Sequence, residues 1–114
     1  MKPITLSLDE ALKTVIDRYN DDKIRKKFKG WVNALQFSFP DIEKAYTFAI
    51  NSDEGIKMSE GMYADAAVNV SIPSDMFIQL LTKQINAITA YSSGLLKVEG
   101  DMKNLLKMRK LINF

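Results

Sequence analysis

Residues 93–112 read SGLLKVEGDMKNLLKMRKLI, which is the pattern of a strand, a tight turn and a helix. Apolar residues at 95, 96 and 98 are interleaved with charged ones and bounded by a glycine at each end, as in a half-buried strand. Asp101 follows at the position of a helix N-cap, where its carboxylate can accept from free N–H groups of the first turn. From Met102 onward the apolar spacing becomes helical. We therefore predict a strand before Gly100 and a final helix that extends from Met102 to Ile112.

The residues upstream predict two helices, four strands and two further helices, in that order. Ser7 and Glu10 have capping-box spacing at the start of a helix that runs to Tyr19, and a short basic helix follows before residue 30. Apolar and polar residues then alternate, and their spacing suits an antiparallel meander. Its four strands are expected over residues 31–39, 45–50, 56–58 and 66–72. Ser74 is the expected N-cap of the next helix, and a short helical turn is expected over residues 86–92.

The strand, the Gly-Asp-Met turn and the Leu- and Met-rich last helix resemble the C-terminal signature of sterol carrier protein type 2 domains. The order of the elements agrees with that family over nearly the whole chain, and the Pro73-Ser74-Asp75 entry into a helix also looks like its pattern. The resemblance implies an α+β fold. In that fold, a curved five-stranded, mostly antiparallel sheet is covered on one side by about five helices, with an apolar tunnel between. It also implies a non-enzymatic, intracellular carrier of lipid.

Composition sets limits on the function. A length of 114 residues predicts one domain over residues 1–114. With 16 basic and 14 acidic residues, the net charge of +2 is too balanced to indicate a nucleic-acid partner. Cysteine and histidine are both absent from the sequence, which removes disulfides, thiolate metal sites and the commonest general base. There is also no apolar run of the ~18 residues that a membrane span needs. We therefore expect a cytoplasmic protein.

No pair of residues predicts a reaction. The neighbouring carboxylates at 9 and 10, 21 and 22, and 53 and 54 all fall at expected helix starts or turns. Acidic residues at such positions usually cap the backbone or are solvated. We therefore expect no catalytic residue, no metal ion and no cofactor, and an isomerase that uses Tyr and Asp has the least support.

A carrier needs apolar side chains beyond those of its core, and the six methionines and six phenylalanines are suited to an adaptable apolar lining. Apolar helical stripes are core by default, so it is the family resemblance that favours a ligand cavity. The residues expected to line it come from the strands, the helix after the fourth strand and the last helix. They are Trp31, Phe37, Phe48, Phe77, Leu80, Leu81, Ile85, Ile88, Val98, Met102, Leu105, Leu106, Met108 and Ile112.

A basic cluster over residues 23–29 has two interpretations. Lys23, Lys26 and Lys27 could steer the acidic head group of a fatty acid or fatty acyl-CoA, or make a transient contact with an anionic membrane surface. Alternatively, the cluster is a solvated helix face that nearby aspartates offset. The expected partner is therefore a lipid or fatty acyl ligand, and the protein is either a monomer or a homodimer.

Two other classes of function stay open. The first is a protein–protein interaction module, which could act as a dimer and would have a filled core and an exposed apolar patch in place of a tunnel. The second is nucleic-acid binding through the basic cluster, for which the overall charge gives no support. An interior with room for an acyl chain would favour the carrier.

Overall fold

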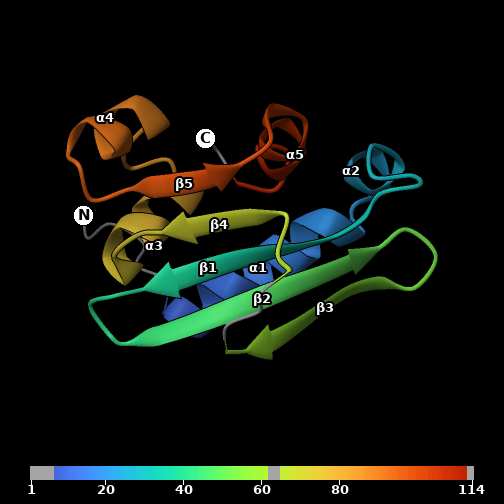
Figure 1. Cartoon of the computed structure of the whole chain (residues 1–114), viewed down its shortest axis with the longest axis horizontal. Helices are drawn as coiled ribbons and strands as arrows, with labels where there is room; N and C mark the ends of the chain where they lie inside the picture. Colours follow the sequence, from blue (N-terminus) through green and yellow to red (C-terminus); the bar gives the residue numbers. More distant parts are fainter. Residues whose placement is uncertain (1–6, 62–64, 113–114) are drawn as a thin grey trace, which may run out of the picture.

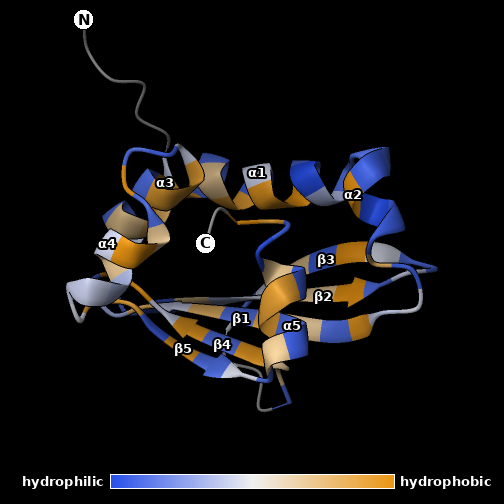
Figure 2. Ribbon diagram, turned by 90° about the horizontal axis from the view of Figure 1, so that it is seen from above, coloured by the Kyte–Doolittle hydropathy of each residue, from blue (hydrophilic) through white to orange (hydrophobic). Residues whose placement is uncertain are grey.

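The computed structural model describes residues 7–61 and 65–112. Within these residues five helices and five strands follow one another (Figure 1), and none of the helices is long and apolar enough to cross a bilayer. The elements are α1 (Leu8–Asn20), α2 (Asp22–Lys26), β1 (Val32–Phe39), β2 (Lys44–Asn51), β3 (Gly55–Glu60), β4 (Val68–Ser71), α3 (Ser74–Leu81), α4 (Ala87–Ser92), β5 (Lys97–Gly100) and α5 (Met102–Met108). The strands form one mixed sheet in the order β3-β2-β1-β4-β5, and α1 and α3 lie over one of its faces (Figure 2). The predicted α+β class and the mostly antiparallel five-stranded sheet are confirmed.

The sheet is not a simple meander. β1, β2 and β3 are antiparallel neighbours, but β4 lies on the other side of β1 and runs parallel to it, with Val70 opposite Phe37. The amide of Ala67 donates to the carbonyl of Ala34 at 2.8 Å, which brings the chain onto that edge of β1. There both valines of β4 are buried, whereas most residues of β3 are exposed. The predicted meander is therefore wrong for β4, because burial selects the inner position.

Helix α1 begins as its sequence predicts. The backbone amide of Glu10 donates to Ser7 Oγ at 3.2 Å, and the amide of Ser7 donates to Glu10 Oε1 at 3.1 Å, so the capping box is complete. The buried side of the helix carries Leu12, Val15 and Tyr19, at the spacing of one helical face. This side packs on the core, which fixes α1 over the sheet.

The start of α3 differs from the prediction. Ser74 is the first residue of the helix and Pro73 is its N-cap, without a side-chain capping bond. The capping group instead comes from the turn between β1 and β2, where Asp41 accepts hydrogen bonds from the Ser74 amide at 2.9 Å and from the Ser74 hydroxyl at 2.5 Å. The carboxylate satisfies a free donor of the first turn. It therefore ties α3 to one end of the sheet.

The last helix is shorter than its sequence pattern predicts. Asp101 is its N-cap residue, as expected, but α5 ends at Met108. The following residues turn without forming helix and run between α1 and the sheet (Figure 2). Leu111 and Ile112 are fully buried there, and both backbone amides donate to the carbonyl of Met108. Leu111 and Ile112 are thus part of the core, and we call residues 109–112 the C-terminal segment.

Candidate functional site

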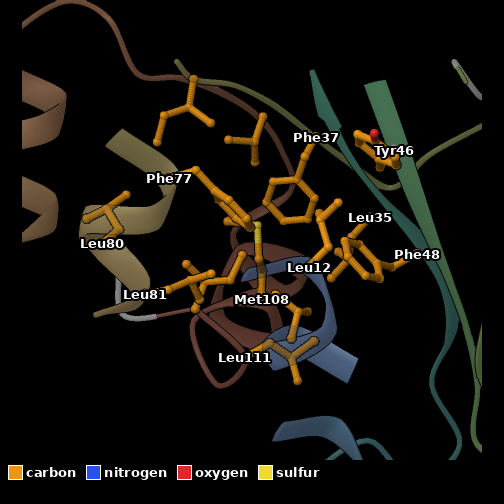
Figure 3. Close-up of a cluster of buried hydrophobic side chains, with 14 of the residues drawn as sticks. Leu12, Leu35, Phe37, Tyr46, Phe48, Phe77, Leu80, Leu81, Met108 and Leu111 are labelled. Carbon is orange, nitrogen blue, oxygen red and sulfur yellow. The ribbon is translucent and has the colours of Figure 1, made fainter. Parts of the chain in front are cut away.

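The space between the sheet and the helices is filled by aromatic and aliphatic side chains (Figure 3). The ring of Phe37 lies 5.7 Å from that of Phe48 on the neighbouring strand and 5.4 Å from that of Phe77 on α3. Offset and edge-on contacts at such distances are the favourable arrangements for aromatic pairs. These three rings form the wall of the interior on the side of the sheet and α3.

Met108 lies in the middle of this interior. Figure 3 shows its side chain among Phe77, Leu12, Leu81 and Leu111, and none of its surface is exposed. The unbranched thioether fills an irregular space that a branched side chain fits less well. The C-terminal segment adds Leu111 and Ile112 to the same layer, and neither has any surface that water reaches. Met108, Leu111 and Ile112 therefore occupy the place where the family resemblance implies a tunnel.

The structure sorts the fourteen predicted lining residues into three groups. Half of them are buried in the interior, namely Phe37, Phe48, Phe77, Leu80, Leu81, Met108 and Ile112. Four lie partly buried at its margin, namely Trp31, Ile85, Val98 and Leu105. The remaining three are on the surface, namely Ile88, Met102 and Leu106.

The expectation that these three residues face the interior is wrong, and helix geometry explains why. Helix α4 lies at the margin of the sheet and buries only Ala90 fully, so Ile88 faces outward. Along α5, Met102 and Leu106 are four residues apart and share the outer side, whereas Leu105 and Met108 share the inner side. The sequence shows one broad apolar arc, and the structure divides it between two sides of the helix.

An arginine holds the C-terminal segment in place. Arg18 Nη1 donates to the carbonyl oxygen of Leu111 at 2.8 Å, and Arg18 Nη2 donates to that of Leu81 at 2.9 Å. Burial lowers the pKa of the Arg18 guanidinium below its usual value, which still leaves it charged at neutral pH. Sequence reasoning missed this residue, because a cation in the last turn of α1 is explained equally well by the helix dipole.

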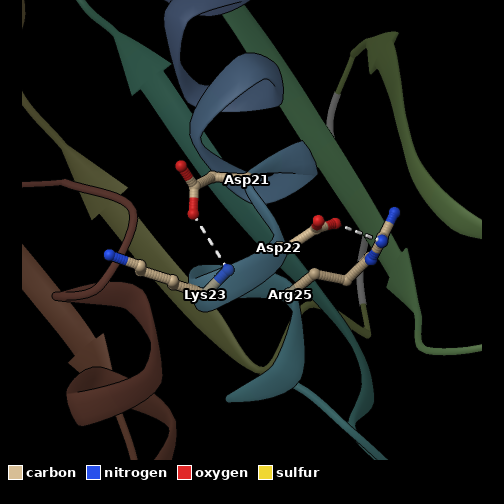
Figure 4. Close-up of polar contacts among 4 residues, drawn as sticks. All are labelled: Asp21, Asp22, Lys23 and Arg25. Carbon is tan, nitrogen blue, oxygen red and sulfur yellow. Dashed lines mark hydrogen bonds and ion pairs between the residues drawn. The ribbon is translucent and has the colours of Figure 1, made fainter.

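A shallow, wide-open cleft of about 540 Å³ lies beside Arg18 between α1 and α2. Lys23 and Lys27 line it, whereas Lys26 does not, although all three lysines are exposed. Asp21 also lines the cleft, and its carboxylate accepts from the Lys23 amide at 2.9 Å as the cap of α2 (Figure 4). Two of the three predicted head-group residues therefore share a cleft with a partly buried arginine. The other lining residues are Thr14, Asp17 and Ile24.

The α2 helix carries both signs of charge on its exposed sides. Arg25 forms an ion pair with Asp22 at 2.6 Å, and Figure 4 shows the Lys23 and Arg25 side chains extending to opposite sides of the helix. Exposed pairs of this kind contribute little to stability. Neither residue of this ion pair lines the cleft, where Arg18 and the two lysines face Asp17 and Asp21.

Polar contacts fasten α5 to the region of α2. The indole Nε1 of Trp31 donates to Asn104 Oδ1 at 3.1 Å, and the ammonium group of Lys107 donates to the carbonyl of Lys27. That ammonium group also lies 5.6 Å from the ring centroid of Phe28, within the range of a cation–π contact. These contacts hold the side of α5 that faces α2, while Met108 packs inside.

One buried polar group has no partner. The hydroxyl of Tyr19 is buried and makes no hydrogen bond to any described residue. Burial raises the pKa of Tyr19, and the charge of Arg25 offsets part of that rise. The hydroxyl is therefore protonated at neutral pH and has an unused donor inside the protein.

Comparison with known proteins assigns the family. Residues 12–113 match the model of the SCP-2 sterol transfer family. The chain belongs to this family. Membership makes lipid binding or transfer the function class of the domain, and it confirms the resemblance seen in the sequence.

This SCP-2 domain is similar both to parts of longer chains and to solved structures of about its own length. Hydroxysteroid dehydrogenase-like protein 2 of Bos taurus is 26% identical over 108 residues, which are 94% of this chain and 25% of that protein. The chain thus spans about a quarter of the length of the curated relatives it matches. A double mutant of the sec-alkyl sulfatase PisA1 superposes with a TM-score of 0.76 at 20% identity, over 94% of this chain and 16% of that chain. Palmitated SCP2L2 from Aedes aegypti has a TM-score of 0.64 at 15% identity, over 93% and 94% of the two chains. Both structures show that the fold is shared.

Proposed function

We propose that this domain is a non-enzymatic carrier that holds a fatty acyl chain between the helices and the sheet. The observation that supports this most is the C-terminal segment, which places Leu111 and Ile112 in the interior without being part of a helix or strand. A segment of this kind can leave without breaking any backbone ladder, and segments of low local stability are the ones that move in ligand binding. The acyl chain would take the place of Met108, Leu111 and Ile112.

The side chains that would leave the interior and the acyl chain that would enter it are similar in size. The side chains of Met108, Leu111 and Ile112 together contain about twelve non-hydrogen atoms, and a close-packed interior needs a replacement of similar volume. An acyl chain of roughly that length or somewhat longer would refill the space without leaving a cavity. We therefore expect long-chain fatty acyl groups to be the ligands, and α5 with the C-terminal segment to be the gate.

The energetics predict moderate affinity and broad specificity. Burial of each CH₂ group of a ligand contributes about 0.8 kcal/mol, but the displaced side chains lose similar burial when the segment opens. The net gain is the difference between these terms, so it depends on total apolar length more than on the details of ligand shape. The rings of Phe37 and Phe77 would contact the ligand on the side of the sheet and α3.

We place the acidic end of the ligand in the cleft beside Arg18, with Lys23 and Lys27 as further cations. A carboxylate binds an arginine fork with two parallel hydrogen bonds, which makes it a strong competitor for the donors that now hold Leu111. The solved form of SCP2L2 from Aedes aegypti is palmitated, which supports a fatty acid as the ligand class. A chain without cysteine also fits a reducing compartment such as the cytoplasm.

Native mass spectrometry and displacement of a fluorescent fatty acid test this proposal directly. Purified protein mixed with palmitate is expected to carry one bound molecule, and unlabelled palmitate is expected to displace the probe. Met108→Ala removes part of the competing side chain, so it is expected to bind the probe more tightly than the wild-type protein does. Met58→Ala, at an exposed methionine on β3, is the matched control and is expected to leave binding unchanged. Absence of both the bound mass and probe displacement in all three proteins would contradict the carrier.

A protein–protein module is the second candidate, and a specific observation favours it. The interior is filled, with no exposed surface on Phe37, Phe48 or Met108, as this alternative predicts. Such a module would take up no fatty acid and would change its mass in solution with protein concentration. Light scattering at several concentrations, run beside the displacement assay, separates the two candidates.

A further inference from the structure

The β5 edge of the molecule exposes large apolar side chains that the interior does not use. On α4 and the loop after it, Ile88, Tyr91 and Leu95 are 79%, 66% and 55% exposed. On α5, Met102 and Leu106 are 69% and 46% exposed. Both helices lie along the β5 edge of the sheet (Figure 1), and the view from that edge in Figure 2 shows apolar residues on the outward side of α5. We call these five residues the α4–α5 face.

Within each helix, the exposed apolar residues are spaced so that they share one side. Ile88 and Tyr91 are three residues apart and Met102 and Leu106 are four apart, so each pair lies on one side of its helix. Residues 93–101 join the two helices, and β5 runs between them along the edge of the sheet. A surface of two short apolar ridges, rather than scattered single residues, is the kind that marks an interaction site.

The charge around this face is asymmetric. Residues 83–112 contain six basic and two acidic side chains, whereas residues 1–82 contain ten basic and twelve acidic ones. On α5 and the turn after it, Lys103, Arg109 and Lys110 are exposed and are three or four residues from Leu106. Cations at these spacings flank the apolar ridge. Their aliphatic stems can lie along an apolar phase while the charged ends stay in water.

We propose that the α4–α5 face docks on the surface of an anionic lipid bilayer. Shallow insertion of apolar side chains, with lysine and arginine at the rim and tyrosine at the headgroup level, is how interfacial helices bind membranes. A second copy of this chain fits less well, because a symmetric interface would bring the two basic rims against each other. Each cation near an anionic surface is expected to strengthen binding about fivefold at physiological salt.

Docking would also give the carrier a route for loading. The inner side of α5 carries Met108 in the interior, and its outer side carries Met102 on the docking face. A bilayer that binds one side of α5 therefore lies next to the segment that must open. This purpose rests on the proposed function, whereas docking itself does not.

Flotation with vesicles of phosphatidylcholine, with and without phosphatidylserine, tests the proposal. The wild-type protein is expected to float with the anionic vesicles only, and less at high salt because screening weakens the charge term. The double variant Ile88→Gln and Met102→Gln removes apolar contact and is expected to weaken binding about tenfold or more. Lys103→Glu with Lys110→Glu is expected to weaken it at least as much. Val32→Gln and Lys57→Glu, exposed on the sheet face turned away from the helices, are the matched controls and are expected to bind as the wild-type protein does.

Three results would overturn the proposal. The first is equal binding to both kinds of vesicle, and the second is equal weakening by the control variants. The third is a combined result: the triple variant Lys23→Glu, Lys26→Glu and Lys27→Glu loses binding, while the variant with Lys103→Glu and Lys110→Glu binds fully. This result would place the membrane contact on α2. Fatty acid displacement measured without vesicles keeps the two proposals apart. The Ile88 and Met102 variant is expected to retain displacement, whereas failure of the carrier would abolish it in the wild-type protein and leave flotation intact.

Discussion

Replacement of Arg18 by methionine is expected to free the C-terminal segment. The substitution Arg18→Met keeps an apolar stem of similar length and deletes the donors to the carbonyls of Leu111 and Leu81. When the segment opens, the bond to Leu111 breaks, while the bond to Leu81 on α3 need not. The variant therefore lowers the cost of opening by the contribution of one hydrogen bond.

The size of the effect follows from the nature of that bond. A hydrogen bond with a charged donor contributes about 1.5–3 kcal/mol, and the Leu111 bond is only partly buried, so the lower end applies. A change of about 1.4 kcal/mol corresponds to a factor of about ten in the equilibrium between closed and open states. We expect the segment to open about ten times more often in the variant.

Amide hydrogen exchange measures this opening residue by residue. The amides of Leu111 and Ile112 both donate to the Met108 carbonyl in a turn whose apolar side chains are buried, so they exchange when this turn leaves the interior and its bonds become open to water. They are expected to exchange about tenfold faster in Arg18→Met, while amides of the central strand β1 exchange at the wild-type rate. The control Arg25→Met breaks only an exposed ion pair and is expected to change neither group. Unchanged exchange at Leu111 and Ile112, or an equal increase at β1, would refute the idea that Arg18 holds this segment locally.

Three further predictions concern stability. Tyr19→Phe removes a buried hydroxyl without a partner and is expected to raise the free energy of unfolding by about 1 kcal/mol in urea titrations, whereas a decrease would mean that the hydroxyl is bonded. Burial raises the pKa of Asp41, but the hydrogen bonds from Ser74 outweigh this and lower the pKa below its usual value. Its contribution to stability is therefore present above the unfolded pKa of about 4 and is lost as the pH falls through the lower folded value. Asp41→Ala is thus expected to lower the melting temperature at pH 7 and to match the wild-type protein at pH 2, and a constant difference would contradict the cap. Met108→Ala is expected to lower the free energy of unfolding by about 2–5 kcal/mol and to regain part of this loss when palmitate is added. Met102→Ala is expected to lower it by less than about 0.5 kcal/mol. Equal losses in the two variants would contradict the buried position of Met108.

Features that depend on nearby residues could be predicted from the sequence. The capping box of α1 joins residues three apart, and Asn86 caps α4 by accepting from the Thr89 amide, also three residues away. The alternation in β1 and β2 gives their faces directly, since a strand reverses sides at every residue. In each case the partners lie within the same short stretch, so the pattern of residue types contains the whole interaction.

Features that join distant residues could not be predicted in this way. The cap of α3 comes from Asp41, 33 positions before Ser74, and Arg18 reaches Leu111 across 93 positions. The parallel place of β4 beside β1 depends on which edge buries its valines, which only the assembled sheet decides. The charge types at these sites are common on any surface, so nothing in the local pattern marks them.

The last helix shows why the candidate site was only partly predictable. Apolar residues on both sides of α5 give the same broad arc in sequence whether they line one cavity or serve two surfaces. The position of α5 relative to the sheet decides between these two arrangements, because the turn at Gly100 sets the direction in which α5 leaves β5. A side chain at this glycine would meet the Ala67 carbonyl at 2.8 Å, and its φ of 152° is one that other residues rarely adopt. The close approach of β4 thus fixes the turn, and the turn places Met108 inside and Met102 outside. It follows that the opening of the interior and the outer face of α5 are coupled through a single short helix.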